Sequence, residues 1–164
     1  MSEDTGVTVR GTSLEGKRVI LAVSGGIAAT ESIKLARELR RHGAEIFPLM
    51  SRSAEKVISP LALSWGSGEQ VITEWDPEMS QLGSFDGLIM APATRNSISK
   101  FIHGLLDSPM MMALSALSGR GVPMMFVPSM HNDLFHDAVT SELLSSAREL
   151  GVEVMLEEPT EGRI

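Results

Sequence analysis

The residues best suited to chemistry lie in a run of small and polar side chains, Ala91–Lys100 (APATRNSISK). This run follows an apolar segment, Gly87–Met90, that is typical of a buried parallel strand, and it begins a helical pattern. The first turn of a helix leaves backbone N–H groups free and carries the positive end of the helix dipole. Thr94, Asn96 and Ser97 add hydrogen-bonding side chains, and the Asn96 amide offers a donor and an acceptor that match a carbonyl–imide edge. The run therefore predicts a binding site for a ligand with a polar ring.

A second junction of this kind, Val23–Ala28 (VSGGIA), follows the first predicted strand. Gly25 and Gly26 have no Cβ, so the backbone can turn tightly there and come close to a ligand. A helix that begins near Ala28 directs its N-terminus at this turn, which suits a phosphate group. Taken alone, the two glycines are explained about equally well by an ordinary strand–helix turn, because the full glycine fingerprint of dinucleotide-binding folds is missing. Together, the two junctions favour a cofactor that carries a phosphate and a polar ring.

Two further loops occupy equivalent positions after other predicted strands. Ser51–Ser53 offers two hydroxyl groups and the guanidinium of Arg52 to a phosphate, although this loop taken alone is better explained as a helix cap formed by Ser53. Ser129–Asn132 (SMHN) follows the fifth predicted strand, and a polar surface loop that carries a histidine explains it equally well. Because open parallel sheets bind ligands beyond the carboxyl ends of their strands, we expect these loops to face one crevice.

Composition and charge argue against several classes of function. The chain has 164 residues, 43% hydrophobic and 21% charged, which fits one globular domain. Its net charge of −7 argues against a nucleic-acid or anionic-membrane partner, and no apolar run approaches the roughly 20 residues that span a bilayer. Cysteine is absent, which excludes disulfides and a catalytic thiol of this chain. The histidines are scattered, so we expect no metal site, and without a signal-peptide pattern we expect a cytoplasmic protein.

The pattern of elements predicts how the loops are positioned. Residues 1–16 mix Gly, Ser, Thr and acidic residues without periodicity, which predicts a mobile N-terminal arm before a single domain at 17–164. The expected strands are at 18–24, 45–50, 70–74, 87–91, 122–127 and 152–156, and the expected helices lie near 28–42, 53–64, 97–106, 109–118 and 140–150. This alternation predicts an α/β fold, a Rossmann-like or flavodoxin-like three-layer sandwich around a parallel sheet of about six strands.

Taken in order, the loops resemble those of the flavin-containing cysteine decarboxylases, the HFCD flavoprotein family, over nearly the whole chain. Val23–Ala29 resembles the first FMN loop of that family, and Ala91–Lys100 resembles its PASANT-type flavin motif, with Arg95 where a small residue is usual. Val127–Phe135 (VPSMHNDLF) is similar to the substrate motif PxMNxxMW, with His131 in the asparagine position. This feature looks closest to the decarboxylase domain of the archaeal-type bifunctional enzyme of coenzyme A biosynthesis.

The resemblance implies an FMN-binding lyase that performs the oxidative decarboxylation of a small-molecule or peptidyl cysteine substrate, giving an aminoenethiol or cysteamine product. It also implies a homotrimer or a dodecamer built from trimers. The residues that it implies for cofactor binding are Gly25, Gly26, Ile27, Ser51, Arg52, Ser53, Thr94, Arg95, Asn96, Ser97 and Ser129, and those for substrate binding are Met130, His131 and Asn132.

One departure from the family bears on activity. The catalytic histidine of the family lies between the third and fourth strands, where this chain has Glu78–Leu82 (EMSQL), so Met79 occupies its position. A thioether does not exchange a proton at neutral pH. If the chain decarboxylates without that histidine, His131 is the candidate for proton transfer. Two other functions stay open: an FMN-dependent redox protein of the pterin reductase or electron carrier type, and a regulatory FMN-binding member without enzyme activity.

Overall fold

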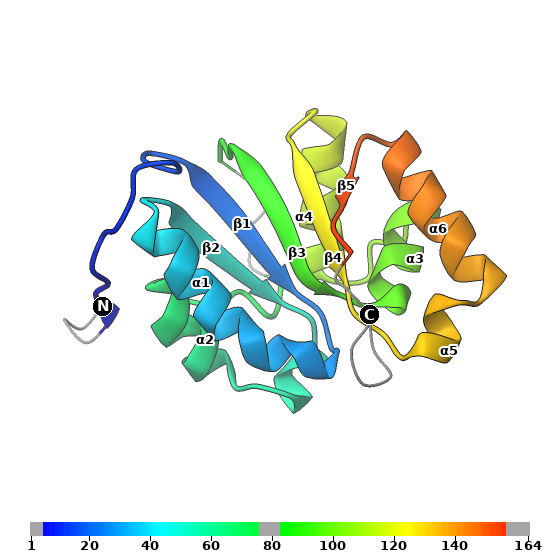
Figure 1. Ribbon diagram of the computed structural model, residues 1–164, viewed down its shortest axis with the longest axis horizontal. Helices are drawn as coiled ribbons and strands as arrows, with labels where there is room; N and C mark the ends of the chain where they lie inside the picture. Colours follow the sequence, from blue (N-terminus) through cyan, green and yellow to red (C-terminus); the bar gives the residue numbers. More distant parts are fainter. Residues whose placement is uncertain (1–4, 76–82, 157–164) are drawn as a thin grey trace.

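The computed structural model describes residues 5–75 and 83–156 and is organised around one parallel β-sheet (Figure 1). The strands of the sheet are Arg18–Val23 (β1), Glu45–Met50 (β2), Gly87–Ala93 (β3), Met124–Pro128 (β4) and Glu153–Val154 (β5). Their order is β2-β1-β3-β4-β5, and every neighbouring pair is parallel. This is the flavodoxin-like strand order, so the expected α/β fold is confirmed, with a five-stranded sheet in place of about six strands.

The sixth expected strand, at 70–74, forms an isolated bridge on the outer side of β2. Ile72 pairs with Leu49, and its N–H and carbonyl bond to the Pro48 carbonyl and the Met50 N–H, each at 3.1 Å. Pro48 has no N–H to donate on that side, so the pairing cannot extend toward the start of β2. The β-branched residues at 71–73 therefore form an extended edge segment rather than a full strand.

Helices connect the successive strands. They are Ser32–Arg41 (α1), Pro60–Ser67 (α2), Arg95–His103 (α3), Pro109–Gly119 (α4), Asn132–Phe135 (α5) and Ala138–Glu149 (α6). Short 3₁₀ helices at Ile27–Glu31 and Ala54–Lys56 precede α1 and α2. In the described ranges, no helix is long and apolar enough to cross a membrane.

The helix expected at 53–64 is divided in two, and a proline is the reason. Ser59 precedes Pro60, and the residue before a proline is disfavoured in the helical conformation. Ser59 is extended instead, with φ −77° and ψ 149°, and its side chain accepts a hydrogen bond from the Ala62 N–H. The two residues therefore begin α2 as an N-cap followed by proline in the first turn.

Both faces of β1, an inner strand of the sheet, are buried, and its side chains alternate between two hydrophobic cores. Along β1, Ile20 and Ala22 belong to one core, whereas Val19, Leu21 and Val23 belong to the other. Residues of α3, α4 and α6 close the first core, and residues of α1 and α2 close the second. Figure 1 shows the first group of helices beside β4 and the second beside β2. An uninterrupted apolar strand sequence is what burial on both faces requires.

The N-terminal arm is bound to the end of α1. The N–H groups of Arg10 and Gly11 donate to the Arg41 carbonyl, and that of Leu14 donates to the His42 carbonyl. Carbonyls at the end of a helix have no partner within the helix. The helix end thus offers acceptors that these residues of the arm use, and the mobility expected of residues 1–16 stays a prediction.

The contact between the arm and α1 generates a prediction about two glycines. Gly43 follows α1 with φ +96°, and a Cβ there would lie 2.8 Å from the Glu15 Cα. Gly151 follows α6 with φ +89°, but a Cβ there would meet nothing within 4 Å. We predict that Gly151→Ala lowers the free energy of unfolding by about 1 kcal/mol, the cost of a left-handed conformation. Gly43→Ala should cost about 1–2 kcal/mol more, because the arm must shift. Urea denaturation measures both, and equal losses would contradict the close contact.

Candidate functional site

Four loops meet where the parallel strands end, which we call the carboxyl edge of the sheet. They are residues 24–27, 51–53 and 129–132, which follow β1, β2 and β4, and residues 92–97, which run from the end of β3 into α3. Backbone hydrogen bonds join neighbouring loops: the Ser51 N–H donates to the Val23 carbonyl at 3.1 Å, and the Ser129 N–H donates to the Ala93 carbonyl at 3.2 Å. The structure therefore brings together the loops that the sequence predicts to face one crevice.

Ser24 joins the β1 and β3 loops through its side chain. The residue is fully buried, and its Oγ donates to the Pro92 carbonyl at 2.6 Å and accepts from the Thr94 N–H at 2.9 Å. The sequence pattern does not single this residue out, because serine is common in turns after strands. What distinguishes Ser24 from other turn serines is its burial between two loops. This burial involves Thr94, which is 70 residues away along the chain, so a local sequence pattern does not reveal it.

The two glycines of the β1 loop have different surroundings. A Cβ on Gly25 would lie 2.3 Å from the Ser53 Oγ and 2.5 Å from the Ser53 Cβ, so glycine is needed for the β1 and β2 loops to approach each other. Gly26 has φ −83° and ψ 160°, an extended conformation that any residue adopts. A Cβ there would make ordinary contacts with the β3 and β4 loops, at 3.6 to 3.9 Å. The backbone does not require glycine at position 26, and the missing side chain leaves space between the loops.

Among the polar residues of the β3 loop, one caps a helix, one is buried and one is exposed to solvent. Thr94 caps α3, since its Oγ1 accepts from the Ser97 N–H at 3.2 Å, and the two hydroxyl oxygens lie 3.1 Å apart. Ser97 is buried. Asn96 is exposed, and its side chain forms no hydrogen bond with the described part of the chain. The Asn96 amide is therefore the group of this loop that is available to a ligand.

A cavity of about 380 Å³ opens beside the β3 loop, between the 51–56 segment and the first turns of α3 and α4. Hydroxyl groups contribute much of its polar lining, together with the Asn96 amide. The hydroxyls belong to Ser51, Ser53, Ser97 and Ser108. Such a lining offers hydrogen bonds to a ligand with many oxygen atoms.

The charged side chains of this cavity are mostly basic, and we call it the basic cavity. Arg52, Lys56 and Lys100 line it, against one acid, Asp107, among the lining residues. Two of the cations have partners: Lys100 Nζ lies 2.7 Å from an Asp107 oxygen, and Arg52 lies 2.7 Å from an oxygen of Glu74. In a chain with a net charge of −7, this local gathering of cations indicates an anionic ligand.

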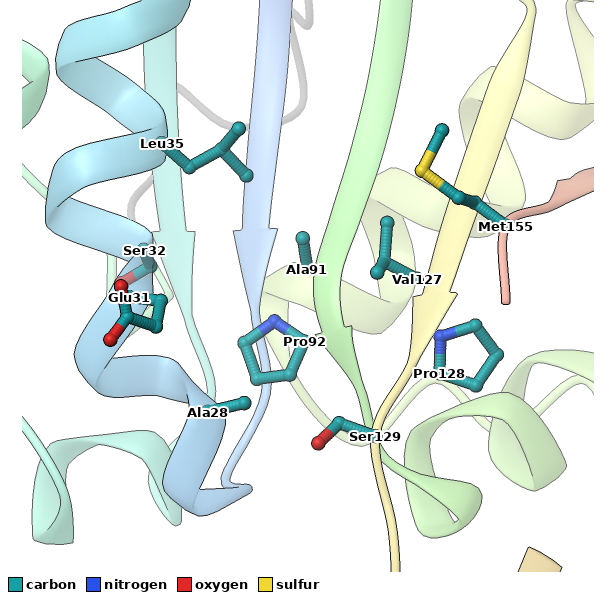
Figure 2. A pocket seen from close by; sticks show the side chains of 10 residues that line it. All are labelled: Ala28, Glu31, Ser32, Leu35, Ala91, Pro92, Val127, Pro128, Ser129 and Met155. Atoms are coloured by element: carbon teal, nitrogen blue, oxygen red, sulfur yellow. The ribbon is translucent and has the colours of Figure 1, made fainter. Parts of the chain in front are cut away.

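A second cavity, of about 290 Å³, lies on the α1 side of the sheet (Figure 2). Figure 2 shows Leu35 and Glu31 on one side of it, Met155 on the other, and Pro92 and Ser129 at the carboxyl edge. It shares no lining residue with the basic cavity. Because most of its lining side chains are apolar, it favours an uncharged group.

Two residues expected to bind the cofactor, Ile27 and Arg95, line neither of these cavities. Arg95 donates to the Asp137 carboxylate at 2.6 Å, which joins the first turn of α3 to the N-cap of α6. Ile27 begins the 3₁₀ helix after Gly26, with 55% of its surface exposed. The Arg95 side chain thus has a partner within the chain that holds the β3 loop in place, and its contact with a cofactor stays a prediction.

In the β4 loop, the His131 side chain is exposed, whereas Met130 is buried and Asn132 is partly buried. The His131 side chain is 64% exposed, and its Nδ1 accepts from the Asp133 N–H at 3.2 Å as the N-cap of α5. Because Nδ1 is an acceptor, the neutral imidazole carries its proton on Nε2. Met130 is 7% exposed and its sulfur lies 4.0 Å from the Thr140 hydroxyl, which donates to the Leu134 carbonyl, while Asn132 Oδ1 is buried without a partner in the described structure. His131 is therefore the residue of this loop best placed to meet a substrate.

Met79, in the position of the family histidine, lies outside the described residues. Within 5–75 and 83–156, no group of three or more His, Asp or Glu side chains is arranged to hold a metal ion. The groups that the described structure gathers at the carboxyl edge are hydroxyls, an amide, an imidazole and cations. These groups suit a phosphorylated organic ligand.

Several known proteins are similar to this chain in sequence or in fold. Residues 8–164 match the protein family described as Flavoprotein. The chain is 35% identical over 157 residues to the coenzyme A biosynthesis bifunctional protein CoaBC of Thermococcus kodakarensis, which covers 92% of this chain. It is 29% identical over 143 residues to a probable phosphopantothenoylcysteine decarboxylase of Streptococcus mutans, covering 82% of this chain and 79% of that protein.

A solved structure, that of the FMN-dependent cysteine decarboxylase SpaF, has the same fold, with a TM-score of 0.77 and 23% sequence identity. The alignment covers 92% of this chain and 88% of SpaF. By contrast, the chain spans only 39% of the length of the Thermococcus kodakarensis protein. The family match includes all four loops of the carboxyl edge, and on this evidence the chain belongs to the flavoprotein family.

Proposed function

We propose that the chain binds one FMN at the carboxyl edge, with the phosphate in the basic cavity, in the homotrimer or assembly of trimers that the family resemblance implies. The observation that carries the FMN site is the gathering of three cations and several hydroxyls in a chain of net charge −7. Cationic donors and hydroxyls form strong hydrogen bonds with phosphate oxygens. Membership of the flavoprotein family calls for a flavin, and the FMN dependence of SpaF supports FMN as its form.

We assign the flavin ring to the space that Gly26 leaves open beside the β3 and β4 loops. The exposed Asn96 amide offers a donor and an acceptor to the imide edge of the ring. Thr94 and Arg95 hold the β3 loop in place, the first through the α3 cap and the second through Asp137. The exposed amide and the anchored β3 loop support this assignment of the ring.

We further propose that the FMN-loaded protein is a carbon–carbon lyase of the phosphopantothenoylcysteine decarboxylase type, acting in coenzyme A biosynthesis. The flavin would supply the two-electron oxidation that makes loss of CO₂ from a cysteinyl carboxylate easy. The named activities of SpaF and of the Streptococcus mutans relative support this reaction. In this chain, His131 is exposed at the carboxyl edge, and its Nε2–H can donate a hydrogen bond to a substrate carboxylate or thiolate.

A redox function without decarboxylation is the second candidate, and Met79 is the observation that favours it. A flavin-dependent reductase or electron carrier needs the flavin loops but no histidine at this position. A thioether can neither donate nor accept the proton that a decarboxylase of this family transfers there. The two candidates differ in whether CO₂ is released.

Removing one cation of the basic cavity tests the phosphate assignment. We predict that Lys100→Met weakens FMN binding about tenfold or more, the effect of losing a charged hydrogen bond. Riboflavin, which has the same ring and no phosphate, should bind the variant and the parent alike. Lys17→Met is the control, because Lys17 precedes β1 at the opposite edge of the sheet. Fluorescence titration gives the affinities, and an equal loss for both flavins would place the phosphate elsewhere.

Alanine at each glycine of the β1 loop separates binding from folding. We predict that Gly26→Ala changes the free energy of unfolding by less than about 0.5 kcal/mol but weakens FMN binding, because the new methyl group occupies the ring space. Gly25→Ala should lower the free energy of unfolding by about 1–3 kcal/mol, since its Cβ would lie 2.3 Å from the Ser53 Oγ. Urea denaturation and flavin titration measure the two effects. Parent-like FMN affinity in Gly26→Ala would show that the ring lies elsewhere.

Restoring histidine at position 79 distinguishes the two functions. We predict that the parent releases CO₂ slowly or not at all from phosphopantothenoylcysteine or a peptidyl cysteine, and that Met79→His raises turnover by roughly 10²–10⁴-fold with little change in FMN affinity. Reduction of the bound flavin by NAD(P)H is measured beside CO₂ release. Turnover of about 1 per second or more by the parent would contradict the histidine assignment and give His131 the proton-transfer role. Flavin reduction without CO₂ release by either protein would support the redox candidate.

A further inference from the structure

The backbone hydrogen bonds between β1 and β3 end at the carboxyl edge, and a side chain makes the next bond between the two segments. The Ser24 N–H donates to the Pro92 carbonyl at 3.3 Å, whereas the Ala93 carbonyl accepts from Ser129 on the other side of β3, at 3.2 Å. Successive residues of a strand direct their backbone groups to alternate sides, so the groups of Pro92 and Thr94 face β1. Pro92 has no N–H to offer. After Pro92, the Thr94 N–H is therefore the first donor that β3 presents to β1.

The hydroxyl of Ser24 replaces a backbone acceptor at this point. In a continuing parallel ladder, the Ser24 carbonyl would accept from the Thr94 N–H. The chain turns instead, and that carbonyl accepts from the Gly26 N–H at 3.1 Å. The Ser24 Oγ accepts from the Thr94 N–H at 2.9 Å and donates to the Pro92 carbonyl at 2.6 Å. One side chain thus connects the Gly26 turn to the cap of α3.

We infer that Ser24 is a positioning residue for the flavin, because its hydroxyl sets the distance between the loop that carries Gly26 and the loop that carries Asn96. This inference rests on the proposed FMN function. Ser24 is fully buried, so it acts through these two loops and does not touch the ligand. Alanine at this position would leave the Thr94 N–H without an acceptor at the start of the β3 loop. Threonine would keep the hydroxyl.

The test compares Ser24→Ala and Ser24→Thr with a buried serine outside the site. Ser67→Ala is the matched control, since Ser67 is 2% exposed and its hydroxyl bonds to the Ser64 and Glu69 carbonyls at the end of α2. Each variant is titrated with FMN by quenching of flavin fluorescence, and the visible circular dichroism of the bound flavin is recorded. Thermal unfolding without FMN reports general stability separately.

We expect Ser24→Ala to bind FMN about tenfold more weakly or worse and to alter the dichroism of the bound flavin. Ser24→Thr should restore both, and Ser67→Ala should lose stability but bind FMN like the parent. Parent-like binding by Ser24→Ala, or an equal loss in Ser67→Ala, overturns the inference and leaves the proposed function in place. A parent chain that binds no FMN overturns both. If Ser24→Ala does not fold, Ser24→Cys takes its place: its thiol is a weaker partner, so reduced affinity supports the inference and parent-like affinity overturns it.

Discussion

Burial of both faces of β1 is the constraint on which the rest of the structure depends. Its side chains alternate between two cores, so helices must cover both faces and the strand must lie inside the sheet. Parallel neighbours on either side then end at the same edge, which is why the loops after β2, β1, β3 and β4 stand in a row. The site follows from strand direction and order, and the individual loop sequences determine only what it binds.

Much of the fold could be predicted from the sequence, because apolar strands and strand–helix alternation are local patterns. The differences come from prolines and from contacts between distant segments. Pro48 limits the pairing of the 70–74 segment, and Pro60 divides one expected helix, effects that a hydrophobic pattern alone does not reveal. The arm before Lys17 has no periodicity, yet its N–H groups donate to carbonyls at the end of α1. Those carbonyls are placed to accept only once that helix has formed.

The loops of the candidate site could also be predicted, whereas the partners of single side chains could not. Thr94 caps its own helix, a role that residue type and position favour. Arg95 pairs with a carboxylate 42 residues away, whereas the family resemblance implies only that this residue binds the cofactor. The roles of Gly25 and Gly26 separate only in three dimensions, where a Cβ on Gly25 would clash with Ser53 and one on Gly26 would make only ordinary contacts with the β3 and β4 loops.

The Ser24 bonds also link ligand binding to the stability of the fold. They join residues 68 and 70 positions apart in the chain, so the two loops have a fixed separation only after the sheet has formed. A ligand that requires this separation binds the folded state and not the unfolded one. By mass action, such a ligand at 100 times its Kd stabilises the folded state by about 2.7 kcal/mol. If the chain binds FMN as proposed, the fraction of it that is folded in a cell depends on how much FMN the cell supplies.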